Sequence, residues 1–258
     1  MRKKIIWTVI VVVLVALAAA AFYVKTNLKG WLINPTNGST QMLLVTAKDW
    51  NSTTGNLQRF ERASLKYPWR KVGDLIPVNL GQNGMGWGIG LHGASLTEGP
   101  KVIEGAKKTP VGVFAINLAF GKDNAKDAEV KLPYMQITNT IFCPDDPKSK
   151  FYNRLVDTKT TSKDWASAED MNKLAQDGFY AAGFVVSHNY DHPSVGMGSC
   201  FFVHAGALNA PTLGCTSLDV NLVKEISVWL EPARKPILVQ LPETIYKEFK
   251  DRWELPQI

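Results

Sequence analysis

The chain has 258 residues, of which 45% are hydrophobic and 20% charged, close to the averages of globular proteins. This composition excludes a wholly disordered chain and gives room for one large domain or two small ones. The net charge of +6 lies almost entirely in the first 30 residues, which hold five basic residues and no acidic one. The rest of the chain is nearly neutral, so a nucleic-acid-binding surface is not expected.

The N-terminal segment has the pattern of a targeting or anchoring sequence. Arg2, Lys3 and Lys4 precede an uncharged stretch over 5–24, which as a helix is about 30 Å long and matches the hydrocarbon core of a bilayer. Small residues over 18–21 resemble a signal-peptidase site. We therefore predict that residues 1–29 form a hydrophobic helix, either a signal peptide or a membrane anchor. The basic residues favour the cytoplasmic side, so the rest of the chain is expected in the periplasm or another extracytoplasmic space.

The body of the chain reads as mostly β. Residues 30–40 are rich in turn formers and predict a linker. Two helices are expected, over 165–176 with Asp164 as N-cap and over 219–230 with Asp219 as N-cap. We predict one mostly-β domain over 41–242, followed by a C-terminal extension over 243–258. The expected strands are 41–46, 57–62, 69–72, 76–80, 111–119, 136–140, 184–187, 200–204 and 236–241.

Residues 198–219 contain the residue types needed for nucleophilic catalysis. A strand over 200–204 would place Cys200 and His204 on one face. Cys215 follows Gly214 and precedes the helix capped by Asp219, and a cysteine ahead of a helix N-terminus is favoured as a thiolate. Backbone N–H groups around Cys215 would form an oxyanion hole, and a nearby imidazole would take the thiol proton. A buried structural cysteine and a structural histidine are the alternative interpretation.

The same residues resemble the catalytic domain of the L,D-transpeptidase (YkuD-like) family. Its hallmark, a histidine on a strand followed by S/T-x-G-C, matches His204 and the segment 212–215, Thr-Leu-Gly-Cys. A second family element, T-P-x-G-x-F/Y, matches 109–114, Thr-Pro-Val-Gly-Val-Phe. The resemblance covers roughly residues 41–242. The chain departs from the family at Leu213, where a histidine or another polar residue is common, and at Thr216, where asparagine or arginine is common.

This resemblance implies a fold, a reaction and a site. The fold would be the YkuD-like β-sandwich with a few short helices. Cys215 would attack a peptidoglycan stem peptide and release its terminal D-alanine, His204 would act as base and then acid, and an amine would resolve the thioester. Gly214 and Thr216 would flank the oxyanion, and Thr212 would contact substrate. Neither a metal nor an organic cofactor is expected. A carboxypeptidase or amidase of the same fold, or a non-catalytic wall-binding protein, remains the alternative.

Further residues are assigned around this site. Trp87 is expected to stack on substrate sugars, and His92 and His188 to line the substrate cleft. The alternatives are a solvent-exposed turn histidine for His92 and a surface-loop histidine for His188. His188 and His192 have the i, i+4 spacing of a zinc site, but the sequence between them predicts a loop, so no metal site is expected. Once Cys215 is assigned as nucleophile, Cys143 and Cys200 are the candidates for a disulfide, and two free thiols are the alternative. The expected partners are peptidoglycan stems and, through an uncleaved anchor, the inner membrane.

Overall fold

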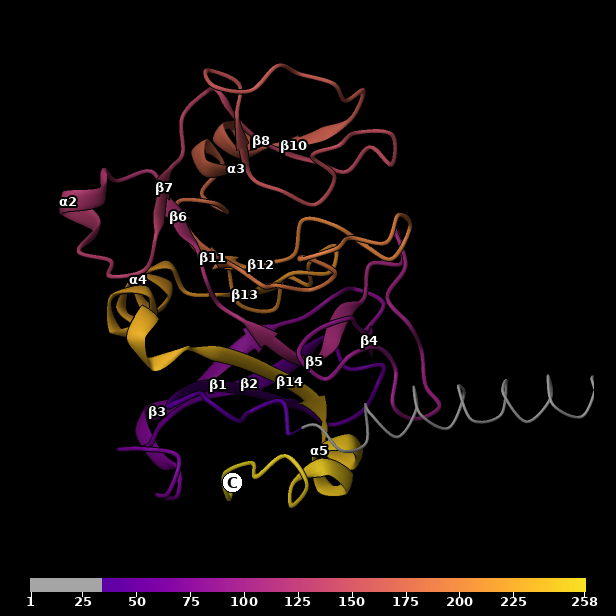
Figure 1. Cartoon of the computed structure of the whole chain (residues 1–258), viewed down its shortest axis with the longest axis vertical. Coiled ribbons are helices and arrows are strands. Elements are labelled where there is room, and N and C mark those ends of the chain that lie inside the picture. The colour runs from indigo at the N-terminus through magenta and orange to yellow at the C-terminus, as the bar shows by residue number, and fades with distance from the viewer. Residues whose placement is uncertain (1–33) are drawn as a thin grey trace, which may run out of the picture.

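The computed structural model describes residues 34–258, which form a mostly-β protein with a large mixed sheet and four short helices (Figure 1). The expected signal or anchor over 1–29 lies outside the described residues. Within 34–258, no helix is long and apolar enough to cross a membrane. The helices are α2 (Ala125–Ala128), α3 (Met171–Gln176), α4 (Val220–Trp229) and α5 (Glu243–Phe249).

The strands form one eleven-stranded sheet and one three-stranded sheet. The small sheet has the order β10 (Ala168–Asp170), β8 (Ile141–Pro144) and β9 (Val156–Asp157). Across the large sheet the order is β4 (Met85–Trp87), β5 (Thr109–Ala115), β14 (Ile237–Pro242), β1 (Gln41–Ala47), β2 (Thr54–Glu61), β3 (Arg70–Asn79), β13 (Thr216–Leu218), β12 (Phe202–Ala205), β11 (Ala182–Val185), β6 (Ala119–Gly121) and β7 (Tyr134–Gln136).

The centre of the large sheet joins the two ends of the described chain. β1 pairs in parallel with β14, so that Leu43 lies opposite Leu238. Both strands are nearly continuous apolar runs, as expected for strands covered on both faces. β1 also pairs antiparallel with β2, and β14 with β5. The first and nearly last segments of the domain therefore form its most buried layer.

The large sheet changes direction where β3 meets β13. A single pair, Asn79 opposite Ser217, connects these strands. Residues from both parts of the sheet, such as Val113 and Val203, belong to one hydrophobic core. In Figure 1, β11, β12 and β13 lie above β1, β2 and β14, and the small sheet with α3 forms the top of the molecule. The arrangement leaves β12 and β13 between the core and the small sheet.

Most of the expected strands are present, with altered ends. The segments 69–72 and 76–80 form one strand, β3, and the segment 111–119 is divided between β5 and β6. The helix predicted over 219–230 is present as α4, and the Asp219 side chain accepts from the N–H groups of Asn221 and Leu222. Its buried residues Val223 and Ile226 lie three positions apart, on the face toward the core.

The helix predicted over 165–176 was wrong in its first half. Asp164 does not cap a helix, because its carboxylate accepts a hydrogen bond from the Ser149 hydroxyl at 2.6 Å. Residues 168–170 form β10 instead, and α3 begins only at Met171 with Asp170 as its N-cap. Pairing with β8 therefore overrides the local helical pattern.

Both ends of the described chain are integral to the core. Arg62 donates to the carbonyls of Thr36 and Ser39, so residues 34–40 are bound to the domain rather than extending from it as a free linker. At the other end, Phe249 on α5 and Trp253 after it are completely buried. The segment over 243–258, expected as an extension, thus completes the hydrophobic core.

Candidate active site

Cys215 and His204 line the same cavity, which has a volume of about 510 Å³. Cys215 reaches it from the loop before β13, and His204 from β12. These neighbouring strands are parallel, and His204 pairs with Ser217, two residues after the cysteine. The opposite wall comes from the small sheet and the segment after α3, through Glu169, Phe179 and Tyr180. The cavity therefore lies between the two sheets.

A turn built by Thr212 shapes the loop that carries Cys215. The Thr212 hydroxyl accepts from the Gly214 N–H at 3.0 Å and donates to the Cys215 carbonyl at 2.6 Å. Gly214 has φ +139°, and a Cβ there would lie 2.8 Å from the Phe201 ring. A glycine is required at this position, because any larger residue would meet both a strained backbone and Phe201. Thr212 lines the cavity, but its hydroxyl is committed to this turn.

The two motifs found about a hundred residues apart in the sequence meet at this loop. The Thr109 hydroxyl donates to the Cys215 carbonyl at 3.2 Å and accepts from the Gly81 N–H at 2.8 Å. Thr212 is also fixed to the same segment, since its N–H donates to the Leu80 carbonyl at 2.9 Å. The T-P-x-G segment thus positions the backbone of the cysteine-bearing loop.

The environment of the Cys215 sulfur is different from the one expected. The three residues of β13 separate Cys215 from α4, so the prediction that the cysteine lies at a helix N-terminus was wrong. The sulfur accepts instead from the Phe202 N–H at 3.4 Å and lies 3.7 Å from the Cys200 carbonyl. Burial, with a further contribution from Glu169, raises the pKa of the Cys215 thiol well above its usual range. The resting group is therefore a neutral thiol.

His204 is held as a neutral imidazole with a defined tautomer. Its Nδ1–H donates to the Ala205 carbonyl at 2.7 Å, because a carbonyl can only accept. Burial lowers the pKa of His204 to about 4. A hydrogen bond with the Phe179 backbone also acts on this ring. With the proton on Nδ1, the remaining lone pair is on Nε2. The Tyr180 ring packs edge-on against the imidazole, with ring centres 5.1 Å apart.

Two residues of this site were missed from the sequence. The Tyr180 hydroxyl contacts the Cys215 thiol and donates to Glu169 Oε2 at 2.6 Å. Burial raises the pKa of Glu169 to about 7, and the nearby carboxylates of Asp145 and Glu104 raise it further. No motif marked these positions, and the predicted helix placed Glu169 in the wrong element. Only the pairing of β10 with β8 brings the carboxyl to the cavity.

The expected oxyanion donors are only partly present. The Gly214 N–H is bonded to Thr212, so its assignment to an oxyanion hole is not supported by the geometry. Thr216 is buried in β13, and its hydroxyl bonds the Gln240 side chain rather than facing the cavity. The Cys215 N–H has no acceptor among residues 34–258. It is therefore the backbone donor at this turn that can receive an oxyanion.

Trp87 and His92 do not line the cavity, contrary to expectation. Trp87 is 2% exposed and His92 1% exposed, and their rings pack against each other with centres 5.8 Å apart. His92 also contacts Phe114 and Trp253. The glycines around Trp87 allow close packing of backbone in the core, not an approach to a ligand. Both side chains are structural.

His188 is also a core residue and not a wall of the cleft. Its Nδ1 accepts from the Ile89 N–H at 3.0 Å, and its Nε2–H donates to the Met197 carbonyl at 2.8 Å. Both ring nitrogens are thus used within the fold. The ring packs edge-on against Phe201 at 4.9 Å, and Phe201 in turn contacts Gly214. His188 therefore packs, through Phe201, against the loop that carries Cys215.

The cysteines divide as expected from the sequence. Cys143 on β8 and Cys200 before β12 form a disulfide, and Cys215 is the remaining free thiol. Cys200 has φ +57° and precedes β12, so it is not on the strand face shared with His204. The Asn153 side chain supports this backbone by accepting from the Cys200 N–H at 2.9 Å. The disulfide thereby ties the small sheet to the residues that contact the Cys215 sulfur.

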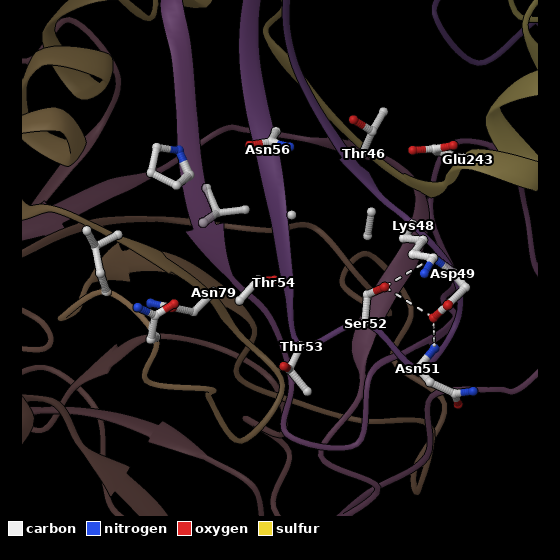
Figure 2. Close-up of a pocket in the computed structure, with 16 residues that line it drawn as sticks. Thr46, Lys48, Asp49, Asn51, Ser52, Thr53, Thr54, Asn56, Asn79 and Glu243 are labelled. Carbon is white, nitrogen blue, oxygen red and sulfur yellow. Dashed lines mark hydrogen bonds between the residues drawn. The ribbon is translucent and has the colours of Figure 1, made fainter.

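A second cavity, of about 710 Å³, is lined by residues of 46–56 and 77–79 and by Leu208, Asn209 and Glu243 (Figure 2). Its lining is polar, and Asp49, Asn51 and Ser52 at one end are bonded to one another. Asn79, at the other end, donates to the Ala207 carbonyl and to the Ser217 hydroxyl. It thereby braces the loop over 206–211.

The described part of the chain contains no group of three or more histidine, cysteine, aspartate or glutamate residues placed to hold a metal ion. Comparisons with models of protein families, with curated proteins and with solved structures return no match. The assignment of a function therefore depends on the residues and geometry of the site itself.

Proposed function

We propose that this protein is a cysteine acyltransferase of the L,D-transpeptidase type, acting on peptidoglycan stem peptides outside the cytoplasmic membrane. The observation that carries the proposal is that Cys215 and His204 line one cavity, while Thr109 of the T-P-x-G segment bonds the Cys215 carbonyl. The finer fold assignment, a YkuD-like β-sandwich, is part of the same proposal. It is supported by the large sheet whose two parts share one core.

The proposed reaction requires only this chain's side chains. As the Cys215 sulfur attacks the stem carbonyl carbon, its proton passes to His204 Nε2 and the new C–S bond forms. Collapse of the tetrahedral intermediate breaks the C–N bond to D-alanine, whose nitrogen takes the proton from His204. The amine of a second stem then attacks the thioester and gives a proton to His204. The C–S bond breaks, and the thiolate recovers its proton.

The resting protonation states fit proton transfer during attack. The half-buried neutral thiol and the buried neutral imidazole, which line the same cavity, carry no charge to be desolvated before substrate arrives. The Cys215 N–H is free to receive the developing oxyanion. The stem occupies the cavity between the sheets, where Leu213 at the rim is 73% exposed.

The test uses the full chain, purified in detergent, and a disaccharide-tetrapeptide. Mass spectrometry of the products is compared between wild type, Cys215→Ala and His204→Gln. A cross-linked dimer made by wild type alone would support the transpeptidase. A tripeptide without dimer would instead assign the carboxypeptidase, with water as acceptor. Unchanged substrate with all three proteins, each shown to be folded by circular dichroism, would contradict the proposal and favour a non-catalytic wall-binding role.

A further inference from the structure

The cavity contains a pair of side chains that the proposed reaction does not use. Glu169 on β10 and Tyr180 before β11 are 2.6 Å apart at their oxygen atoms, and the Tyr180 hydroxyl also contacts the Cys215 thiol. The ring of Tyr180 is fixed by edge-on contacts with Phe202 at 5.3 Å and His204 at 5.1 Å between ring centres. The phenol oxygen is therefore held between the carboxyl group and the sulfur.

A phenol has one proton and cannot donate it to both neighbours. When Glu169 is ionised, it only accepts, so Tyr180 donates to the carboxylate and turns a lone pair toward Cys215. When Glu169 is protonated, its own O–H donates to Tyr180, and the phenol proton is free to bond the sulfur. A hydrogen bond to the charged form of a group favours that form. The second arrangement therefore stabilises the thiolate, and it also removes a negative charge near the sulfur.

We propose that Tyr180 is a further catalytic residue and Glu169 its positioning residue, with the protonated carboxyl turning the phenol proton toward the Cys215 sulfur. This inference rests on the proposed function for its role in acyl transfer. The predicted effect on the reactivity of the Cys215 thiol can be measured without any peptidoglycan substrate. The protonated form of Glu169 is the one that activates the nucleophile, so activation is lost as pH rises through the titration of this carboxyl.

The groups around Glu169 are consistent with a proton being retained near neutral pH. Tyr180 faces it from the segment before β11, Asp145 from the end of β8 and Glu104 from the loop before β5. Cys215, His204 and Lys107 line the same cavity. Burial and the two like charges raise the pKa of Glu169 to about 7. A carboxyl that titrates near the working pH changes state with little free energy.

The same cavity provides a matched control pair. Tyr152 donates to Glu104 Oε2 at 2.6 Å, the same distance as in the Tyr180–Glu169 pair. Glu104 also lines the cavity, but neither Tyr152 nor Glu104 contacts Cys215 by any interaction found in residues 34–258. Removing this second pair changes a part-buried tyrosine–glutamate contact without altering the side chains next to the sulfur.

The experiment measures the rate at which iodoacetamide alkylates Cys215 between pH 5 and 9. The full chain is used without reductant, because the other two cysteines are then protected by their disulfide. In wild type, the logarithm of the alkylation rate should rise with pH below about 7. It should level off near pH 7, where Glu169 ionises, and rise again at higher pH. Glu169→Gln keeps a donor toward Tyr180, so it should show a single rise and react about tenfold faster at pH 8. Tyr180→Phe should react more slowly at pH 6.

Tyr152→Phe should keep the wild-type profile. Glu104→Gln should keep both rises, with the level region moved to lower pH, because one of the two charges that raise the pKa of Glu169 is removed. A single rise in wild type, or equal profiles for Glu169→Gln and Glu104→Gln, would overturn the inference. Circular dichroism shows whether each variant is folded. If Glu169→Gln does not fold, an unchanged profile in Tyr180→Phe would still overturn it. The two proposals can fail separately. If wild type forms no cross-linked stems but still shows the two-step alkylation profile, the proposed function is rejected and the control of Cys215 by Tyr180 is retained.

Discussion

His92 fills the space that a side chain at Gly112 would need. A Cβ built on Gly112 would lie 2.0 Å from His92 Cε1, and the φ of Gly112 is +142°. The histidine is fixed there, because its Nδ1 accepts from the Val113 N–H at 3.1 Å and its ring is enclosed by aromatic side chains. The glycine of the T-P-x-G segment is therefore a packing requirement of the core, on the same strand as Thr109, which bonds the loop that carries Cys215.

We expect Gly112→Ala to lower the free energy of unfolding by more than about 2 kcal/mol, since the methyl group cannot be accommodated without moving His92. Gly178→Ala is the control. Gly178 also has a positive φ, +93°, but nothing lies within 4 Å of its Cβ position. That variant should lose only about 1 kcal/mol. Urea denaturation of both proteins measures the difference, and equal losses would show that the contact with His92 has no energetic cost.

We expect His188→Ala to lower the stability of the fold rather than to weaken substrate binding directly. The change leaves the Ile89 N–H and the Met197 carbonyl without their partner, at a cost of about 1–3 kcal/mol for each buried group. His192→Ala, at an exposed position four residues on, should stay within about 0.5 kcal/mol of wild type. Thermal unfolding tests both variants. An unchanged midpoint for His188→Ala would show that its two hydrogen bonds make no net contribution to stability.

Acid should unfold the protein through its buried histidines. Burial lowers the pKa of His92, His188 and His204 to about 4, whereas in the unfolded chain these side chains titrate near about 6.5. The unfolded state therefore binds more protons between pH 6.5 and 4, and stability falls as pH decreases through this range. Glu169 opposes the trend, because its raised pKa keeps a proton on the folded state that the unfolded state releases above its normal value near about 4.3.

The net difference is about two protons between pH 4.5 and 6.5, which corresponds to about 2.7 kcal/mol per pH unit. Urea denaturation at pH 7.5, 6.5, 5.5 and 4.5 measures this slope. Glu169→Gln removes the opposing proton and should steepen the slope by about half. A stability independent of pH across this range would mean that the histidines are accessible to water in the folded state.

The disulfide between Cys143 and Cys200 should contribute substantially to stability. It closes a loop with a sequence separation of 57 residues, for which loss of chain entropy in the unfolded state predicts about 4 kcal/mol. The double variant Cys143→Ser, Cys200→Ser should lose this stability, and wild type treated with reductant should match it. Cys215→Ser, which removes the free thiol alone, serves as the control and should unfold with the wild-type midpoint.

The sequence predicted those parts of the fold whose signals are local. β1 and β14 follow from apolar runs, and α4 follows from its stripe and from the cap at Asp219. Cys215 and His204 were predicted to act together, and they share a cavity. These features depend on short-range patterns that survive in the folded protein.

Features that depend on tertiary packing could not be predicted. His92 and Trp87 lie near glycines in the sequence, which suggested a cleft, but they are buried against Trp253 and α5 from the far end of the chain. His188 is buried against Phe114 and Phe201. Glu169 reaches the cavity that contains Cys215 only because β10 pairs with β8. A hydrogen bond between Tyr180 and Glu169, eleven residues apart, has no signature in the sequence.

The parallel pairing of β1 with β14 has a consequence for how the protein is made. The neighbours of the first described strand are β2, which follows at once, and β14, which ends at Pro242. During synthesis one edge of β1 therefore stays unpaired until nearly two hundred further residues have been added. Closing such a distant contact is slow compared with forming hairpins and helices. The newly made chain thus passes through an incomplete state in which one edge of a strongly apolar strand is open to association, and arrival of the C-terminal residues ends that exposure.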